Sequence, residues 1–121
     1  MNERARFALT EDVRADARIV AIAGEFDATC AEEARPILTA ASSDPDRALV
    51  INLIDCEFLD STAIALIVAA ARPLINGQIK VAIAARSESE VVQILRLAGI
   101  DRTIPILPTA ELALWSALEI E

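Results

Sequence analysis

The hydrophobic positions along the chain alternate between runs typical of strands and spacings typical of helices. Runs rich in Val, Ile and Ala predict strands. The run at residues 47–54 lacks strict alternation, which is typical of a central strand covered on both faces. The first strand has a weak pattern, and Gly24 breaks the apolar run of the second. The expected strands cover residues 5–13, 17–23, 47–54, 78–85 and 103–107.

Four helices are expected between and after these strands, each with apolar residues at helical spacing. Two of them begin with the Ser/Thr-x-x-Glu pattern of a capping box, at residues 29–32 and 87–90. Pro73 predicts a kink or an early stop in the second helix, and Gly99 stands where a left-handed residue ends the third. The expected helices cover residues 29–41, 61–75, 87–98 and 109–118.

The resulting order is β-β-α-β-α-β-α-β-α, an α/β pattern. Because βαβ crossovers are right-handed and join parallel strands, this order predicts a mixed, mainly parallel β-sheet with about four helices. The N-terminal strand is expected to be antiparallel. The chain has 121 residues and no internal repeat, linker or low-complexity segment, so we expect a single domain over residues 1–121.

Composition and charge narrow the classes of function. Hydrophobic residues make up 55% of the chain but aromatic residues only 3%, so the core must be built from Ala, Ile, Leu and Val. The net charge of −8 argues against binding of nucleic acid or of anionic membrane surfaces and is compatible with a basic protein partner. The absence of histidine excludes a histidine-containing triad, a Cys–His pair and a histidine-ligated metal site.

Two further features concern the cellular compartment. Cys30 and Cys56 form no CxxC motif, and we expect both thiols to lie reduced in the interior of a cytosolic protein. The N-terminus lacks the apolar stretch of a signal peptide. The longest apolar run, residues 63–71, is about half the length that crosses a bilayer. We therefore expect a cytoplasmic protein with no direct membrane insertion.

The stretch from Asp55 to Ile64 places Ser61 at the start of a predicted helix. A phosphate on Ser61 would meet the free amides and the positive dipole end of that helix. It would also add about −1.5 to −2 charges beside Asp60. No nearby side chain can activate the hydroxyl as a nucleophile, so we expect a phosphate acceptor and no enzyme. The alternative is that Asp60 or Ser61 is only an N-cap.

The helix after Ser61 carries no charged residue between Thr62 and Arg72. A helix that is apolar on all sides is either buried or covers something outside its own domain. A domain of this size has little room to bury a helix completely, so its periphery is a candidate docking surface. A well-covered, alanine-rich helix remains the alternative. The peripheral residues are Ile64, Ala65, Val68 and Ala69.

Acidic side chains follow two of the expected strands and raise the alternative of a magnesium site. No lysine stands at a nearby strand end, and no glycine-rich phosphate loop is present. We therefore expect no metal site and no cofactor. The acids are Glu25 and Asp27 after the second strand, and Asp55, Glu57 and Asp60 after the third.

Three motifs resemble those of the STAS domain family, which includes bacterial anti-sigma-factor antagonists and the cytoplasmic tails of sulfate transporters. Residues 24–27 (Gly-Glu-Phe-Asp) resemble the Gly-Glu-Leu-Asp that follows the second strand in the family. Residues 60–64 (Asp-Ser-Thr-Ala-Ile) resemble its Asp-Ser-Ser/Thr-Gly-Leu signature, with Ala63 and Ile64 as departures. Residues 95–101 resemble its Leu-x-x-x-Gly-Leu-Asp. The resemblance covers nearly the whole chain and implies a STAS-like fold.

This resemblance implies a non-enzymatic switch protein of the anti-sigma-factor antagonist type. In the family, the serine that matches Ser61 is phosphorylated by the partner, an anti-sigma factor with serine-kinase activity, and a serine phosphatase reverses the reaction. The unphosphorylated form binds the anti-sigma factor, which releases the sigma factor and so regulates transcription. The residues expected at the partner surface are Glu25, Asp27, Asp60, Thr62, Ile64 and Ala65.

Functions of other classes stay open, as does assembly into a homodimer. One alternative is a STAS subunit that docks on a membrane transporter complex for lipids or anions, where Ser61 would serve as a docking residue and never be modified. The acidic strand ends would instead suit a small phosphoryl-transfer or nucleotide-binding domain.

Overall fold

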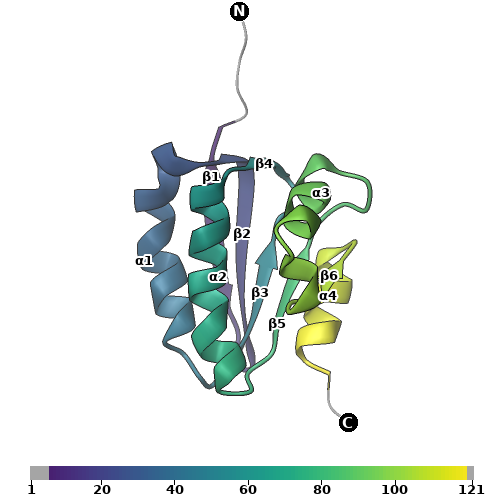
Figure 1. The fold of residues 1–121 in the computed structure, drawn as a ribbon. Helices are drawn as coiled ribbons and strands as arrows, with labels where there is room; N and C mark the ends of the chain where they lie inside the picture. The colour runs from purple at the N-terminus through teal and green to yellow at the C-terminus, as the bar shows by residue number, and fades with distance from the viewer. Residues whose placement is uncertain (1–5, 120–121) are drawn as a thin grey trace, which may run out of the picture.

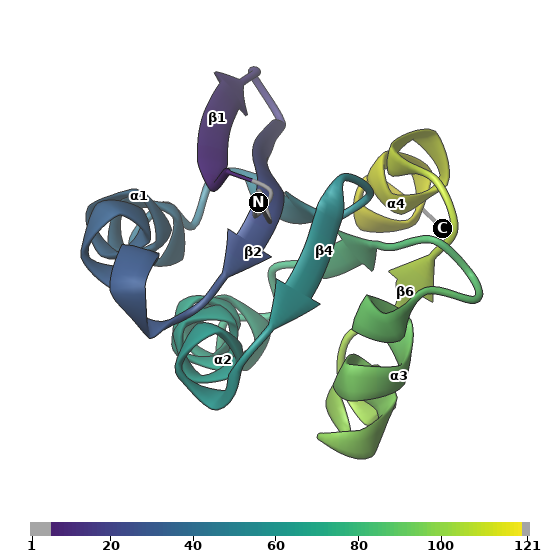
Figure 2. The ribbon, with the colours of Figure 1, turned by 90° about the horizontal axis from the view of Figure 1, so that it is seen from above.

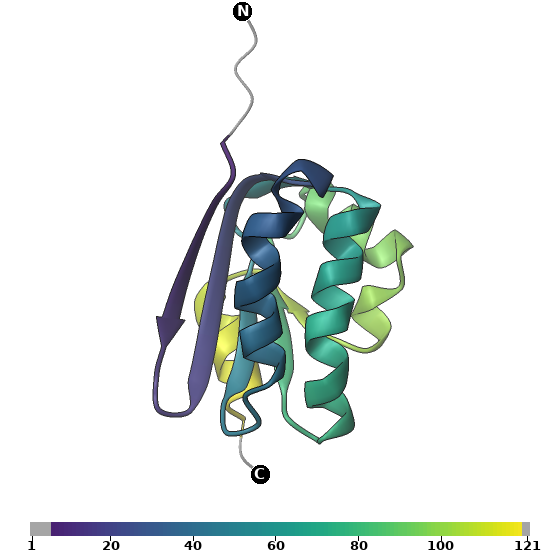
Figure 3. The ribbon, with the colours of Figure 1, turned by 90° about the vertical axis from the view of Figure 1, so that its left-hand side faces the viewer.

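Helices cover both faces of one central sheet in the computed structural model, which describes residues 6–119. Three helices lie on one face, with α1 and α2 side by side, and α4 lies on the other (Figures 1, 2 and 3). The helices are α1 (Ala31–Ser42), α2 (Ser61–Asn76), α3 (Glu90–Leu97) and α4 (Ala110–Ala117), with short 3-10 turns η1 (Ala28–Cys30) and η2 (Ile100–Arg102).

The sheet has six strands within residues 6–119, in the order β1-β2-β3-β5-β6, and β4 pairs with β2 beside this path. Only the pair β1–β2 is antiparallel, and every other pair is parallel. This arrangement confirms the mixed, mainly parallel sheet with an antiparallel N-terminal strand. The strands are β1 (Ala8–Val13), β2 (Ala17–Phe26), β3 (Ala48–Asn52), β4 (Cys56–Leu59), β5 (Val81–Ala84) and β6 (Ile106–Leu107).

The central position of β3, predicted from its apolar run, is confirmed. Leu49 and Ile51 belong to the core cluster on the side of α1, α2 and α3, whereas Val50 packs with Ala113 of α4 on the other side. These three β3 side chains are at most 1% exposed. Burial of an aliphatic side chain stabilises the fold by roughly 1.5–3 kcal/mol, so the strand is held from both faces.

Two expected helix starts are wrong by two residues. Asp27, and not Thr29, caps the turn before α1, since its carboxylate accepts a hydrogen bond from the Thr29 backbone N–H at 3.0 Å. Ser89, and not Ser87, caps α3 by accepting from the Val92 backbone N–H at 3.2 Å. In both cases the capping side chain stands two residues from the one that the Ser/Thr-x-x-Glu pattern indicates, so this pattern alone misplaces both starts.

The remaining helix signals have mixed outcomes. Thr109 caps α4 by accepting from the Leu112 backbone N–H at 3.0 Å, and Gly99 adopts the expected left-handed conformation after α3. Pro73 does not stop α2, which continues to Asn76. Among residues 6–119, no helix combines the length and the apolar character that a membrane span requires.

The strand β4 lies between the expected strand 47–54 and the expected helix 61–75, where no strand is predicted. β2 continues past Gly24 to Phe26, and over these last residues it pairs with β4 instead of β3. The register shifts between Gly24 and Glu25, and Gly24 has a φ of +82°, which residues with a side chain rarely adopt. A Cβ at this position would lie 2.0 Å from the backbone oxygen of Arg6. Gly24 is therefore an irregularity within the strand, not its end.

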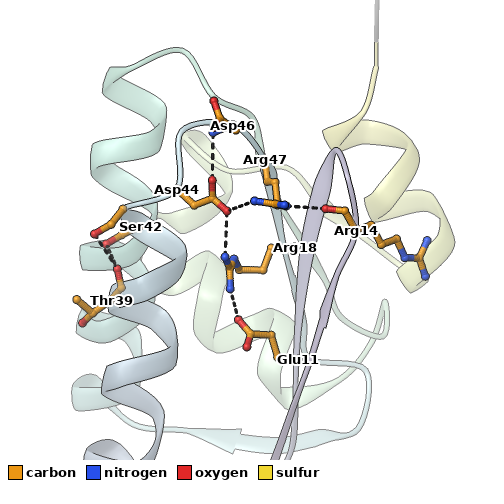
Figure 4. A network of polar contacts seen from close by, with 9 residues as sticks. Glu11, Arg14, Arg18, Thr39, Ser42, Asp44, Asp46 and Arg47 are labelled. Atoms are coloured by element: carbon orange, nitrogen blue, oxygen red, sulfur yellow. Dashed lines mark hydrogen bonds and ion pairs between the residues drawn. The ribbon is translucent and has the colours of Figure 1, made fainter.

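A network of ion pairs connects β1, the start of β2 and the loop before β3 (Figure 4). Asp44, which follows α1, accepts a hydrogen bond from Arg18 of β2 at 2.9 Å and another from Arg47 at 2.8 Å. Arg18 also pairs with Glu11 of β1, and Arg47 donates to the backbone oxygen of Arg14 at 2.6 Å. The hydrogen bonds from Arg18 and then from Arg47 lower the pKa of Asp44. One carboxylate thus connects α1 to β2 and to the start of β3.

Replacing Gly24 with alanine should destabilise the protein more than the same change at Gly99. Both glycines have a positive φ, but a Cβ at Gly99 would meet no atom within 4 Å, whereas one at Gly24 would overlap backbone atoms. We expect Gly99→Ala to lower the free energy of unfolding by about 1 kcal/mol and Gly24→Ala by at least about 2 kcal/mol. Urea denaturation of both variants measures this difference, and equal losses would contradict it.

The Asp44 network should make stability depend on pH in the acid range. The pKa of Asp44 is lower in the folded protein than in the unfolded chain. The ionised carboxylate therefore contributes stability that is fully present above the pKa of the unfolded chain and is lost as the pH falls through the pKa of the folded protein. We expect the difference in unfolding free energy between wild type and Asp44→Asn to be largest at pH 7 and to become smaller below about pH 4. Urea denaturation at pH 7 and in the acid range tests this, and a difference that does not change with pH would refute it.

Candidate functional site

The start of α2 is formed by Asp60 and not by Ser61. Asp60 has an extended backbone, and its Oδ1 accepts a hydrogen bond from the Ala63 backbone N–H at 2.9 Å, which makes it the N-cap. Ser61 is the first residue inside the helix and is exposed. Its hydroxyl makes no hydrogen bond with any residue of the described part of the chain. Of the two capping alternatives, the structure therefore selects Asp60 and leaves the Ser61 hydroxyl open to solvent.

The same Asp60 carboxylate also reaches the start of a second helical segment. Its Oδ2 accepts a hydrogen bond from the Ala28 backbone N–H of η1 at 2.9 Å. The Asp60 backbone N–H in turn donates to the carbonyl oxygen of Phe26, the last residue of β2, at 3.3 Å. Hydrogen bonds to an ionised carboxylate are stronger than those between neutral groups, so Asp60 fixes the two helix starts relative to each other.

Asp27 forms the neighbouring turn. Its Oδ1 accepts from the backbone N–H and from the hydroxyl of Thr29, at 3.0 and 2.6 Å. Because Asp60 holds Ala28, the residue after Asp27, the two acids lie on adjacent turns at the carboxyl ends of β2 and β4. Glu25 is half-buried one residue before the end of β2 and is in register with Phe58 of β4.

The helix α2 is neither fully buried nor fully exposed. Leu66, Ile67 and Ala70 face the core. On the opposite side Ser61, Ala65 and Ala69 are exposed at a spacing of four residues, which places them in one row. Half-buried side chains flank this row, namely Thr62, Ile64 and Val68. The structure therefore shows an outward face of small residues that begins at Ser61.

The two cysteines lie in the core near these turns and are free thiols. The Cys30 sulfur is 3.5 Å from the Glu25 carbonyl oxygen, and the Cys56 sulfur is 3.4 Å from that of Phe58. Burial raises the pKa of Cys30, and it raises the pKa of Cys56 to about 11. Both thiols are therefore protonated at neutral pH, and neither is prepared to act as a nucleophile.

The acidic side chains do not gather into a metal site. Within residues 6–119, no group of three or more Asp, Glu or Cys side chains is placed to hold a metal ion. Asp55 points to Arg86, whose guanidinium lies 3.4 Å away. Asp27 and Asp60 direct their carboxylates at backbone amides. The arrangement therefore caps helices, and the magnesium alternative has no ligand set in the described residues.

Local sequence rules miss two parts of this site. The hydrogen bond from the Ala28 backbone N–H to Asp60 joins residues that are 32 positions apart, and no local sequence pattern around either residue predicts it. The pairing of β2 with β4 that brings them together depends on Gly24, whose apparent signal is a strand end. A motif comparison finds both segments, since residues 24–27 and 60–64 carry two of the three STAS-like motifs, but it does not provide their contact.

Comparisons with known proteins agree with this architecture. A family model described as the STAS domain matches residues 8–113. An anti-sigma factor antagonist from Mycobacterium paratuberculosis is 25% identical, with 94% of this chain and 96% of that one covered and a TM-score of 0.83. A search of curated proteins found no match.

Two more distant structures share the fold. An anti-sigma-factor antagonist (STAS) domain protein from Planctomyces limnophilus is 22% identical, with 90% and 96% of the two chains covered and a TM-score of 0.76. SpoIIAA, a Bacillus cell fate determinant in its phosphorylated form, is 19% identical, with the same coverages and a TM-score of 0.66. Together with the family model over most of the chain, these likenesses show that the protein belongs to the STAS domain family and has the fold of the anti-sigma factor antagonists.

Proposed function

We propose that this STAS domain is a partner-switching anti-sigma-factor antagonist controlled by reversible phosphorylation of Ser61. In this proposal the unphosphorylated form binds an anti-sigma factor with serine-kinase activity, which modifies Ser61, and a serine phosphatase restores the binding form. The observation that carries the proposal is the exposed Ser61 hydroxyl, which has no hydrogen-bond partner in the described residues. A kinase reaches such a hydroxyl without first breaking a contact.

The surroundings of Ser61 explain how a phosphate would act as a switch. The backbone amides of Ser61 and Thr62 lie in the first turn of α2, where intrahelical acceptors are lacking, so they are free to receive phosphate oxygens. Asp60 stands next to Ser61 and already occupies the Ala63 amide. A phosphate with about −1.5 to −2 charges at this place would add bulk and a desolvation cost to any close contact with the helix. A protein of this fold, SpoIIAA, has been solved in a phosphorylated and an unphosphorylated form, so the fold accommodates both states.

The surface proposed for the anti-sigma factor combines small apolar residues with acidic turns. Ala65 is exposed one turn after Ser61, and Ile64 beside it is half-buried, so a partner can approach the helix closely. Asp27, Asp60 and Glu25 lie at the adjoining strand ends and suit a basic partner, in line with the net charge of −8. The proposed contact residues are Glu25, Asp27, Asp60, Thr62, Ile64 and Ala65.

The second candidate function is a STAS subunit that docks on a transporter of lipids or anions and is never modified. The exposed row of Ser61, Ala65 and Ala69 favours it as much as it favours a switch, because close helix packing needs only small side chains. The two functions differ in the chemical state of Ser61. Intact-mass measurement of protein purified from its native cells separates them: one added phosphate mapped to Ser61 supports the switch, and protein that is never phosphorylated supports the subunit.

Two substitutions of Ser61 should have different effects on the affinity for the anti-sigma factor. We expect Ser61→Asp to weaken binding to the cognate anti-sigma factor at least about tenfold, because the added carboxylate is bulkier and must be desolvated where the partner packs closely against small side chains. Ser61→Ala should bind like the wild type and should no longer accept phosphate. Calorimetric titration measures the affinities, and Ser87→Asp, also exposed but between β5 and α3, is the control for added charge. Equal affinities of the Asp and Ala variants at position 61 would overturn the switch.

Asp60 should be needed for the folded site as well as for binding. Asp60→Ala removes the cap of α2 and leaves the Ala28 amide without its acceptor, so we expect a loss of about 1–2 kcal/mol in the free energy of unfolding. Asp60→Asn keeps one amide oxygen as the cap and should lose less. Urea denaturation compares the two variants, and an unchanged stability of Asp60→Ala would mean that the bridge contributes nothing.

A further inference from the structure

The second half of α2 and the turn that follows α3 lie on the three-helix face of the sheet (Figure 1). They border a groove between them. Its volume is about 340 Å³. Arg72, Asn76 and Thr103 provide its polar rim. The apolar walls are Val68, Ala71, Ile75, Ala98, Ile100 and Ile104.

The charge around this groove is opposite to that of the whole chain. Arg72 lies in the wall, Arg102 precedes Thr103 of the rim, and Arg96 lies in the last turn of α3. All three are exposed, and none of them forms an ion pair within the described residues. Asp101 is the sole acid in the two segments 68–76 and 96–104. In a chain with a net charge of −8, this is a local excess of positive charge.

The three arginines differ in how far the fold itself explains their positions. Arg96 is favourably placed at the C-terminal end of α3, where a cation compensates the helix dipole, so its position has an explanation within the fold. No such explanation covers Arg72, which is not in the last turn of α2. Arg102 forms no ion pair with a described residue either, although other arginines, such as Arg18 and Arg47, do. Arg72 and Arg102 are therefore cations available to a ligand.

Leu97 indicates the size of the ligand. It is 89% exposed, more than any other large hydrophobic side chain of the described residues, and it directly precedes Ala98 of the groove wall. A small molecule confined to the groove would leave Leu97 in water. A polypeptide segment that runs along the groove covers the apolar walls and Leu97 together.

We infer that this groove docks an acidic amphipathic segment of a partner protein. Its aliphatic side chains fill the groove between Val68 and Ile104 and cover Leu97, and its carboxylates pair with Arg72 and Arg102. This is the helix-in-groove mode of peptide recognition, with charge complementarity at the rim. The docking site does not depend on the proposed function, because Arg72 lies 11 residues beyond Ser61, about 16 Å further along the helix axis.

A peptide selection with matched variants tests this inference. A displayed library of random 16-residue peptides is selected on the full-length protein and depleted on an Arg72→Glu/Arg102→Glu double variant. Enriched peptides are then measured by fluorescence anisotropy. The control is Arg35→Glu, a charge reversal at an exposed arginine of α1 outside the groove. Sodium dodecanoate is titrated in parallel as a small apolar anion.

The expected result is enrichment of sequences that combine Asp or Glu with Leu, Ile or Phe. Their affinity should fall about tenfold in the double variant, remain unchanged in Arg35→Glu and weaken with added salt. Amide signals of residues 68–76 and 98–104 should shift on binding in a heteronuclear NMR spectrum. Three results would overturn the inference: no enrichment that depends on the two arginines, enrichment of basic sequences, or binding of dodecanoate with no peptide selected. Circular dichroism of the double variant excludes loss of folding as the cause.

Discussion

The candidate site depends on one carboxylate that two helix starts share. Asp60 accepts from the Ala63 amide of α2 with one oxygen and from the Ala28 amide of η1 with the other, both at 2.9 Å. It can do so only because β4 pairs with the last residues of β2 and brings Asp60 beside Phe26. An Asp in this position can accept hydrogen bonds from the free backbone amides of two helix starts at once. The exposure of Ser61 follows, since Asp60 takes the capping role that the serine would otherwise fill.

Local periodicity predicts the elements of this fold, and contacts distant in sequence decide where they end. The order of strands and helices, the parallel sheet and the central place of β3 all follow from apolar runs that each element carries within itself. The end of β2 does not, because Gly24 looks like a strand breaker until its neighbour β4 is known. The start of α1 fails for a related reason. Thr29 and Glu32 fit the sequence pattern of a capping box, but Asp27, directly after β2, is the residue that accepts from the free backbone N–H of Thr29.

The same limit applies to the site. From residue types, the acids around Ser61 could be metal ligands or helix caps, and only the geometry separates these two roles. Asp27 and Asp60 point at backbone amides, while Asp55 lies toward Arg86. Ser61 could be predicted from the motif it belongs to, but whether its hydroxyl caps the helix could not. That depends on which residue, Asp60 or Ser61, has the extended backbone that a cap requires.

Helix α2 therefore presents surfaces of opposite charge at its two ends. Its first turn adjoins the acidic turns of Asp27 and Asp60, and its second half presents Arg72 at the edge of an apolar groove. Between them no residue is charged, and Leu66, Ile67 and Ala70 hold the helix in the core. The two surfaces are separated by about 16 Å along the axis, well beyond the Debye length of roughly 8 Å at physiological ionic strength. Screening therefore makes them electrostatically independent. A phosphate on Ser61 would disturb close packing of a partner at the first surface and leave an acidic segment at the second in place.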